Sequence, residues 1–166
     1  RYLTKPELYG DVRILNWGDV SKTLPVEKFD FILTARSIHG WMQDEPNTVH
    51  DTFVEFHKAL KPGGILAVEQ HRAKPGTNPE KPDTGYVTEA YVIEQAQKAG
   101  FTLAGRSEIN ANPKDTTDHP LGVWTLPPAL RSSSYSSGKP DDPNFDHSKY
   151  LAIGESDRMT LKFVKK

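Results

Sequence analysis

Residues 29–72 read FDFILTARSIHGWMQDEPNTVHDTFVEFHKALKPGGILAVEQHR. This stretch begins with a nearly continuous apolar run at residues 29–34, which is typical of a parallel strand covered on both faces. A second apolar run occupies residues 65–68. Parallel strands need a crossover connection, and this connection is almost always right-handed. The stretch therefore predicts one strand–helix–strand unit and places the chain in the α/β class.

The predicted crossover is an amphipathic helix with clear signals at both ends. Asn47 or Thr48 can cap its start. Its apolar residues recur at spacings of four, three and four, so that they share one face; they are Val49, Phe53, Phe56 and Leu60. The KPGG sequence at residues 61–64 ends the helix, because proline cannot continue it and glycine supplies a left-handed turn.

Shorter elements are predicted on both sides of this unit. Residues 12–17 form a short β-prone run, and Thr88 caps a helix that extends to residue 99. Strands are expected at residues 101–109 and at residues 157–164, where apolar and polar residues alternate. Residues 110–156 carry many turn residues and little periodicity. We therefore expect a single domain over residues 1–166 in which 110–156 is mostly loop or insertion.

Composition excludes several classes of function. The 166 residues carry a net charge of -1, which gives no electrostatic reason to expect nucleic acid or an anionic membrane as a partner. The chain has no cysteine, which excludes disulfides, zinc–thiolate sites and thiol nucleophiles.

Several runs together resemble the class I S-adenosylmethionine-dependent methyltransferases. The KPGG turn occurs across many of these enzymes. The runs HRAKPG at residues 71–76, AGF at 99–101 and SDRMTLKF at 156–163 look like a group of predicted bacterial methyltransferases of unassigned substrate. The resemblance covers about residues 11–165. It implies a Rossmann-like methyltransferase sheet with helices on both faces, S-adenosylmethionine as cofactor, and methyl transfer to a small molecule.

The sequence departs from this family at its start. Family members begin with a strand that ends in a glycine-rich loop, which accommodates the methionine part of the cofactor, and a second strand that ends in an acidic residue. Neither is found here, because the paired glycines at residues 63–64 precede a strand instead of following one. In the family the sheet order is 3-2-1-4-5-7-6, so the first two strands and the loop are missing from the expected fold.

Two hypotheses follow from this departure. In the first, the chain is the C-terminal part of a methyltransferase, truncated, cleaved, or completed by a second chain or by a homo-oligomer. In the second, it is a non-catalytic fragment or subunit that needs a missing N-terminal half to bind cofactor. A third hypothesis is an oxidoreductase that uses a nicotinamide cofactor. It would need the same missing glycine loop, and the sequence runs that resemble methyltransferases do not support it.

The resemblance also implies a set of cofactor-binding residues. In open α/β sheets, ligands bind beyond the carboxyl ends of the strands. Asp19 follows the first predicted strand, at the position of an acidic residue that accepts from the adenine amino group. Thr34 and Arg36 follow the next strand, where the family's residues flank the sulfonium. The alternative for Asp19 is a loop residue that caps a turn.

Two histidines and three other residues are candidates for chemistry on the acceptor. His39 and His71 can act as general bases, because the ordinary pKa of histidine lies near neutrality. Strand alternation places Glu69 and His71 on one face, with Gln70 and Arg72 on the other. The candidates for substrate binding are Trp41, Glu69 and Arg72. The alternatives are a loop hydrogen bond for His39, a cover over the helix start for Trp41, and a structural ion pair for Arg72.

A metal site is not predicted. His50 and His57 share a helix face but are separated by two turns, which is too far for one ion. His119 and His147 fall in predicted loops and are expected to be solvated.

Overall fold

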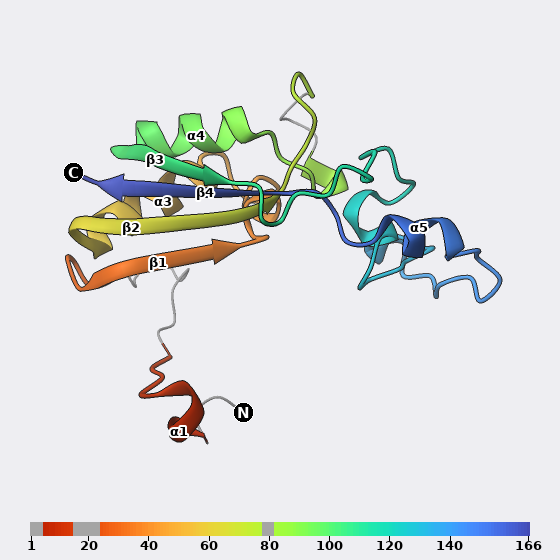
Figure 1. Cartoon of the computed structure of the whole chain (residues 1–166), viewed down its shortest axis with the longest axis horizontal. Coiled ribbons are helices and arrows are strands. Elements are labelled where there is room, and N and C mark those ends of the chain that lie inside the picture. Colours follow the sequence, from red (N-terminus) through yellow and green to blue (C-terminus); the bar gives the residue numbers. More distant parts are fainter. Residues whose placement is uncertain (1–4, 15–23, 78–81) are drawn as a thin grey trace.

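The computed structural model describes residues 5–14, 24–77 and 82–166. Its centre is a four-stranded sheet (Figure 1), whose strands are β1 (Phe29–Ala35), β2 (Leu60–His71), β3 (Phe101–Ser107) and β4 (Arg158–Lys165). The strand order is β1-β2-β4-β3. β1 and β2 are parallel, while β4 runs antiparallel to both of its neighbours. This is the 4-5-7-6 half of the methyltransferase sheet, and it confirms the expected fold class.

The predicted strand–helix–strand unit forms, but both ends of its helix differ from the prediction: no side-chain cap hydrogen bond forms at its start, and the helix ends at Ala59, before the KPGG sequence. Between β1 and β2 lie the short α2 (Ile38–Trp41) and the longer α3 (Thr48–Ala59). The predicted apolar stripe of α3 is buried. The KPGG sequence forms the irregular start of β2, and the register with β1 shifts there, from Phe29 opposite Leu60 to Phe31 opposite Ile65. Gly63 has a φ of +78°, the left-handed conformation that glycine adopts without strain.

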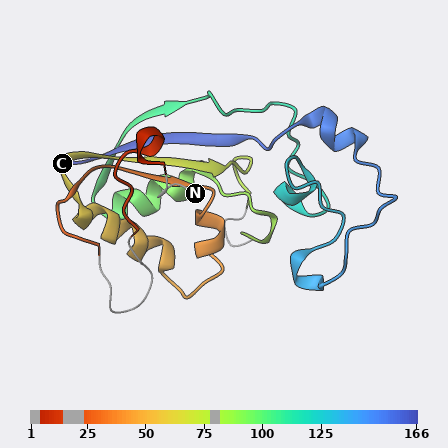
Figure 2. The ribbon, with the colours of Figure 1, turned by 90° about the horizontal axis from the view of Figure 1, so that it is seen from below.

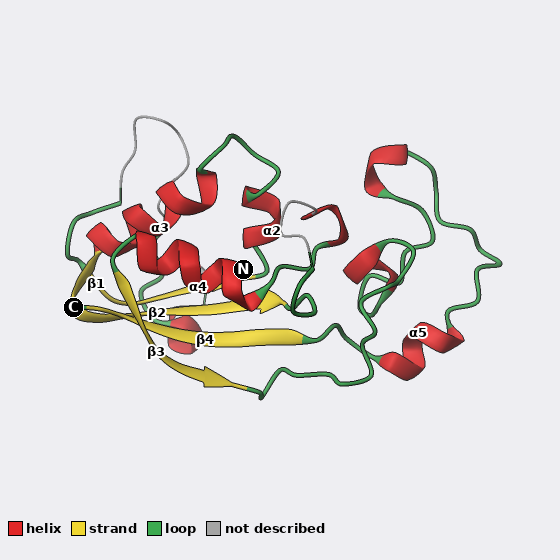
Figure 3. Cartoon of the chain, turned by 90° about the horizontal axis from the view of Figure 1, so that it is seen from above, coloured by secondary structure: helices red, strands yellow, loops and turns green. Residues whose placement is uncertain are grey.

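The helices gather on one face of the sheet. α4 (Glu89–Lys98) begins at Thr88, whose side-chain oxygen accepts a hydrogen bond from the Tyr91 N–H, as the capping prediction required. α3 and α4 pack against each other and against the sheet, and Figures 2 and 3 show α2 on the same side. The core between the layers is formed by apolar side chains, among them Phe53, Leu66, Val92, Leu161 and Phe163.

The opposite face of the sheet is largely open in the described part of the chain. On β1, Phe31 is 55% exposed and Leu33 is 60% exposed. The expectation of helices on both faces is therefore met on one face by the residues that the structure describes. α1 (Pro6–Tyr9) buries none of its residues.

The strand predicted at residues 12–17 falls only partly within the structure. Residues 12–14 are irregular and exposed, and the remainder lies outside the described residues. The predicted cofactor residue Asp19 lies outside them as well.

The insertion lies beyond the carboxyl ends of β1 and β2 (Figure 1). Its regular elements are short: η2 (Gly122–Thr125), η3 (Tyr135–Ser137) and α5 (Ser148–Ile153). It nevertheless has a buried interior, which includes Asp115, His119, Val123, Leu126 and Tyr150. The expectation that His119 is solvated is wrong: its Nε2 lies 2.8 Å from the buried Asp115 Oδ1. A carboxylate from the same loop supplies the partner that burial of an imidazole requires, and spacing alone does not reveal this pair.

Asp115 also joins the insertion to the sheet. It accepts hydrogen bonds from the Tyr86 hydroxyl at 2.9 and 2.8 Å and from the Asp157 N–H, just before β4, at 2.8 Å. Tyr86 follows the short η1 (Pro82–Thr84). None of the helices in the described residues has the length and apolar character needed to cross a bilayer.

Candidate functional site

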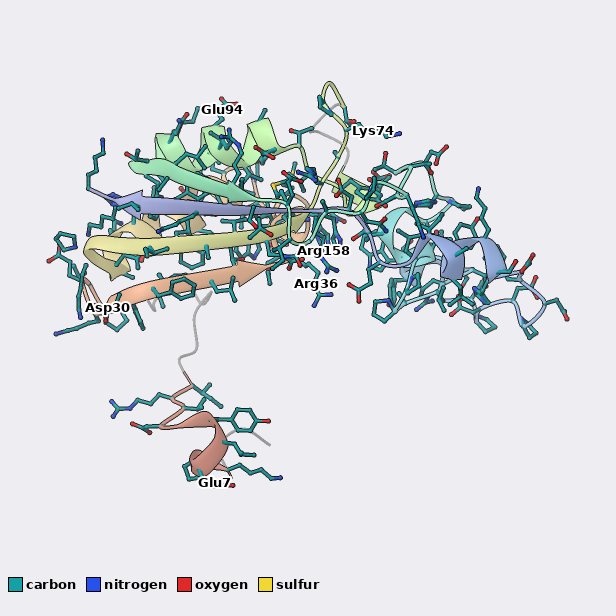
Figure 4. All side chains as sticks on the ribbon, viewed as in Figure 1. Glu7, Asp30, Arg36, Lys74, Glu94 and Arg158 are labelled. Atoms are coloured by element: carbon teal, nitrogen blue, oxygen red, sulfur yellow. The ribbon has the colours of Figure 1, made fainter. Side chains whose placement is uncertain are left out.

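A cavity of about 380 Å³ opens where β1 and β2 end and the insertion begins. Because β4 is antiparallel to β2, its first residue arrives at this same edge of the sheet. Figure 4 labels the two lining arginines, Arg36 after β1 and Arg158 at the start of β4. The lining comes from four parts of the chain and comprises Ala35, Arg36, His39, His71, Val123, Trp124, Pro127, Pro128, Ala129, Ser156 and Arg158. This is the edge at which ligands bind in open α/β sheets.

Gln70 fixes the imidazole of His39 in the wall of the cavity. The Gln70 Oε1 accepts a hydrogen bond from the Ile38 N–H at 3.2 Å, and its Nε2 donates to the Gly85 carbonyl at 3.0 Å. These two backbone groups allow only one orientation of the amide, since an N–H needs an acceptor and a carbonyl needs a donor. The second Nε2 hydrogen then points to His39 Nδ1, 3.1 Å away. His39 Nδ1 is therefore an acceptor, and the ring proton of neutral His39 is on Nε2.

His71 is the second histidine of the cavity, and its ring centroid lies 5.7 Å from that of His39. Its Nδ1 lies 2.5 Å from the Ser156 Oγ. Burial, followed by the positive surroundings of His39, Arg36 and Arg158, lowers the pKa of His71 to about 3. Burial also lowers the pKa of His39, against an opposing effect of its hydrogen bond with Gln70. Both rings are consequently neutral near pH 7. The lone pair of His39, on Nδ1, is occupied by the hydrogen bond from Gln70, so the general-base role expected for His39 does not fit this arrangement.

The charged groups of the cavity are unequally paired. Arg158 Nε lies 2.6 Å from Glu69 Oε1, and Arg158 also pairs with Glu155. Arg36 Nε lies 3.9 Å from Glu69 Oε2, and the Arg36 side chain is 51% exposed. Arg36 also has a φ of +53°, which is uncommon for a residue with a side chain and occurs often at ligand sites. The Arg158 guanidinium is therefore held in close ion pairs, whereas the Arg36 guanidinium has only one long ion pair.

The remaining wall is apolar. Trp124 meets the His39 ring edge-on at a centroid distance of 5.7 Å. Beside it, a cis peptide bond joins Pro127 to Pro128. A ligand in this cavity would contact polar groups from the strand ends and α2 and apolar side chains from the insertion.

The structure brings together four of the residues selected from the sequence. His39, His71 and Arg36 line the cavity. Glu69 forms ion pairs with Arg36 and Arg158. The alternation prediction for β2 is confirmed, because Gln70 is fully buried on the helix side while Glu69 and His71 are partly exposed. Thr34 is buried within β1 and does not reach the cavity.

Two predicted substrate residues lie elsewhere. The Trp41 ring packs edge-on against Phe56 in the last turn of α3, with centroids 6.1 Å apart, and Trp41 lines a separate hollow beside the start of α3. Arg72 donates from Nε to Asp157 Oδ2 at 2.9 Å and from Nη2 to Glu108 Oε2 at 2.7 Å. It lines a different hollow of about 790 Å³ beside the start of α4, where its charge is paired in a network of acids. Arg72 therefore forms the structural ion pair that was the alternative to a role in substrate binding.

Sequence reasoning missed four residues of the site. Gln70 carried a usable signal, since a polar residue on the buried face of a strand needs specific partners. Arg158 and Ser156 lie in the run at residues 156–163, but only the antiparallel insertion of β4 brings them to the strand ends. Trp124 sits in a segment without periodicity, and its position depends on how the insertion folds.

The described residues fit part of the cofactor site that the fold implies. The segment after β1 leads directly into the cavity through Arg36. The paired glycines lie at the start of β2, at the other end of the strand from His71, so they cannot form a cradle at this edge. In the described ranges, no group of three or more His, Asp or Glu side chains could hold a metal ion.

No family model matches the chain, and no curated protein is significantly similar to it in sequence. Solved structures do share its fold. A 1,6-didemethyltoxoflavin-N1-methyltransferase from Burkholderia thailandensis, with 1,6-didemethyltoxoflavin and S-adenosylhomocysteine bound, matches with a TM-score of 0.54 and 12% identity over 99% of this chain and 56% of that chain. A S-adenosylmethionine-dependent methyltransferase from Methanosarcina mazei matches with a TM-score of 0.51 and 9% identity, over 87% of this chain and 63% of that one.

A third match is the cyclase SpnF, with a TM-score of 0.50 and 16% identity over 87% of this chain and 52% of that chain. The chain therefore spans between 52% and 63% of the length of these structures. At these identities the likeness establishes the Rossmann-like methyltransferase fold. It does not establish the reaction, since one fold carries different chemistries.

Proposed function

We propose that this chain takes part in S-adenosylmethionine-dependent methyl transfer to a small molecule, and that the acceptor binds in the cavity at the ends of β1 and β2. The observation that carries the proposal is the position of two neutral histidines at the ligand edge of a methyltransferase sheet. S-adenosylmethionine supplies the methyl group when it is bound. The acceptor must present a nucleophilic atom, and a base is needed if that atom carries a proton.

His71 and His39 have different roles in this proposal. His71 is the candidate proton acceptor, because its neutral ring lines the cavity and keeps a lone pair; its pKa of about 3 makes it a weak base, suited to an acceptor atom that loses its proton readily. His39 presents Nε2–H to the acceptor and orients it. Glu69 positions the two arginines, and the backbone at Thr34 and Arg36 borders the cofactor side. Asp19 is retained as a residue for the adenine.

The second hypothesis is that the chain binds cofactor only with a further protein segment. It is favoured by the free edge of β1 in the described residues, with Phe31 and Leu33 exposed, and by the 52% to 63% of the related structures that the chain spans. Such a segment would come from a second chain or from another copy of this one.

A calorimetric titration of the 166-residue chain with S-adenosylhomocysteine separates the two hypotheses. Micromolar binding supports a cofactor site in this chain. Absence of heat at millimolar ligand, with a folded protein by circular dichroism, supports the second hypothesis and contradicts a complete cofactor site in this chain.

A further inference from the structure

The cavity divides into a donor side and an apolar side. Arg36, just after β1, and His39, on α2, present N–H groups, while Trp124 and the two prolines contribute the apolar part of the lining. Apolar pockets with a few fixed polar groups bind organic molecules whose orientation those groups determine. The ligand that fits has a flat apolar body and one polar end.

The charges of the cavity favour a single negative charge at that polar end. Glu69 lies 2.6 Å from Arg158 and only 3.9 Å from Arg36, so one guanidinium is neutralised and the other is held loosely. A dianion would need a second free cation. Lysine is absent from the lining, and both histidines are neutral near pH 7 because burial lowers their pKa values.

His39 adds a neutral donor of fixed direction. Its Nδ1 accepts from Gln70, so the opposite ring edge, with Nε2–H, remains for a ligand. A planar guanidinium and a fixed N–H together match the two oxygens of a carboxylate.

We propose that this cavity binds the carboxylate of a small molecule with a flat apolar body, held by Arg36 and His39 with Trp124 against its ring. The inference rests on the proposed function in so far as this molecule is the methyl acceptor. A negative acceptor also offsets the repulsion between Arg36 and a cationic sulfonium, which would otherwise disfavour the cofactor at this edge.

The test titrates the full chain with benzoate and, separately, with benzamide, which has the same size and no charge. Binding is monitored by NMR. Benzoate should bind about tenfold or more tightly than benzamide, because a charge-assisted pair is stronger than a neutral hydrogen bond. Arg36→Asn should remove this preference. Asparagine accepts a left-handed backbone, so the variant should keep the fold.

Arg106→Gln is the matched control. It removes one exposed positive charge on β3, where Arg106 pairs with Glu89, and it should leave the preference intact. Equal binding of benzoate and benzamide to the unmodified chain would overturn the proposal, as would an unchanged preference in Arg36→Asn. The ligand comparison on the unmodified chain decides the question even if the variant does not fold.

The titration with S-adenosylhomocysteine keeps the two proposals apart. Charge-dependent benzoate binding without binding of S-adenosylhomocysteine would overturn a cofactor site in this chain and support the carboxylate site. Binding of S-adenosylhomocysteine without a preference for benzoate would support the cofactor site and overturn the carboxylate site.

Discussion

Gln70 determines which ring nitrogen of His39 carries the proton. Its amide has no freedom to flip, because Ile38 N–H and the Gly85 carbonyl demand opposite ends of it. We therefore predict that neutral His39 is the Nε2–H tautomer. Long-range proton–nitrogen NMR spectra at pH 7 should show an unprotonated Nδ1 and a protonated Nε2. In Gln70→Leu the hydrogen bond is lost and the spectrum should report a mixture of tautomers. A protonated Nδ1 in the unmodified protein would contradict the assignment.

His71 should make the fold sensitive to acid. Its pKa is about 3 in the folded chain and about 6.5 in the unfolded chain. Between these values the unfolded state binds a proton that the folded state does not, so stability falls as the pH falls from about 6.5 toward 3. One such group contributes at most about 1.4 kcal/mol per pH unit, and partial exposure reduces this figure.

The variant His71→Gln keeps a hydrogen-bonding group near Ser156 and removes the titration. Urea unfolding at pH 7, 6, 5 and 4 should give a shallower fall of unfolding free energy with acid for this variant than for the unmodified chain. Parallel curves would show that His71 does not carry the effect.

Among the elements, the turn before β2 provides a matched pair of glycines. A Cβ on Gly64 would lie 2.8 Å from the Lys61 carbonyl oxygen, whereas a Cβ on Gly63 would meet nothing within 4 Å. Gly63 instead needs its left-handed φ of +78°. Gly63→Asn should cost about 1 kcal/mol or less, because asparagine tolerates this conformation. Gly64→Asn should cost clearly more, because the backbone itself must move.

Thermal unfolding of the two variants checks this. The melting temperature should fall further for Gly64→Asn than for Gly63→Asn. The reverse order would mean that the left-handed φ of Gly63 limits stability at this turn more than the lack of room for a Cβ at Gly64.

For the whole molecule, sequence periodicity predicted the sheet and helices but only part of the site. The apolar runs of β1, β2 and α3 could be located because burial on a regular element leaves a repeat in the sequence. His39 and His71 could be placed because they follow predicted strands. Trp124 and Ser156 could not, because they reach the cavity through the insertion and through the antiparallel path of β4. The Asp115–His119 pair was missed for the same reason, since a buried polar pair in an irregular segment has no period.

The exposed face of β1 leads to a prediction for the assembled protein. Phe31 and Leu33 project from an edge strand, and apolar edge strands tend to pair with another chain. We expect the unmodified chain to self-associate in a concentration-dependent way. In the double variant Phe31→Thr, Leu33→Thr, threonine keeps the strand propensity and removes apolar area, so light scattering after size exclusion should report a single chain. Ile109→Thr, at a position between β3 and the insertion that is 82% exposed, is the control and should not change the mass. If the unmodified chain is monomeric at high concentration, pairing through this face is ruled out. If Ile109→Thr loses self-association as readily as the double variant, the contact lies elsewhere.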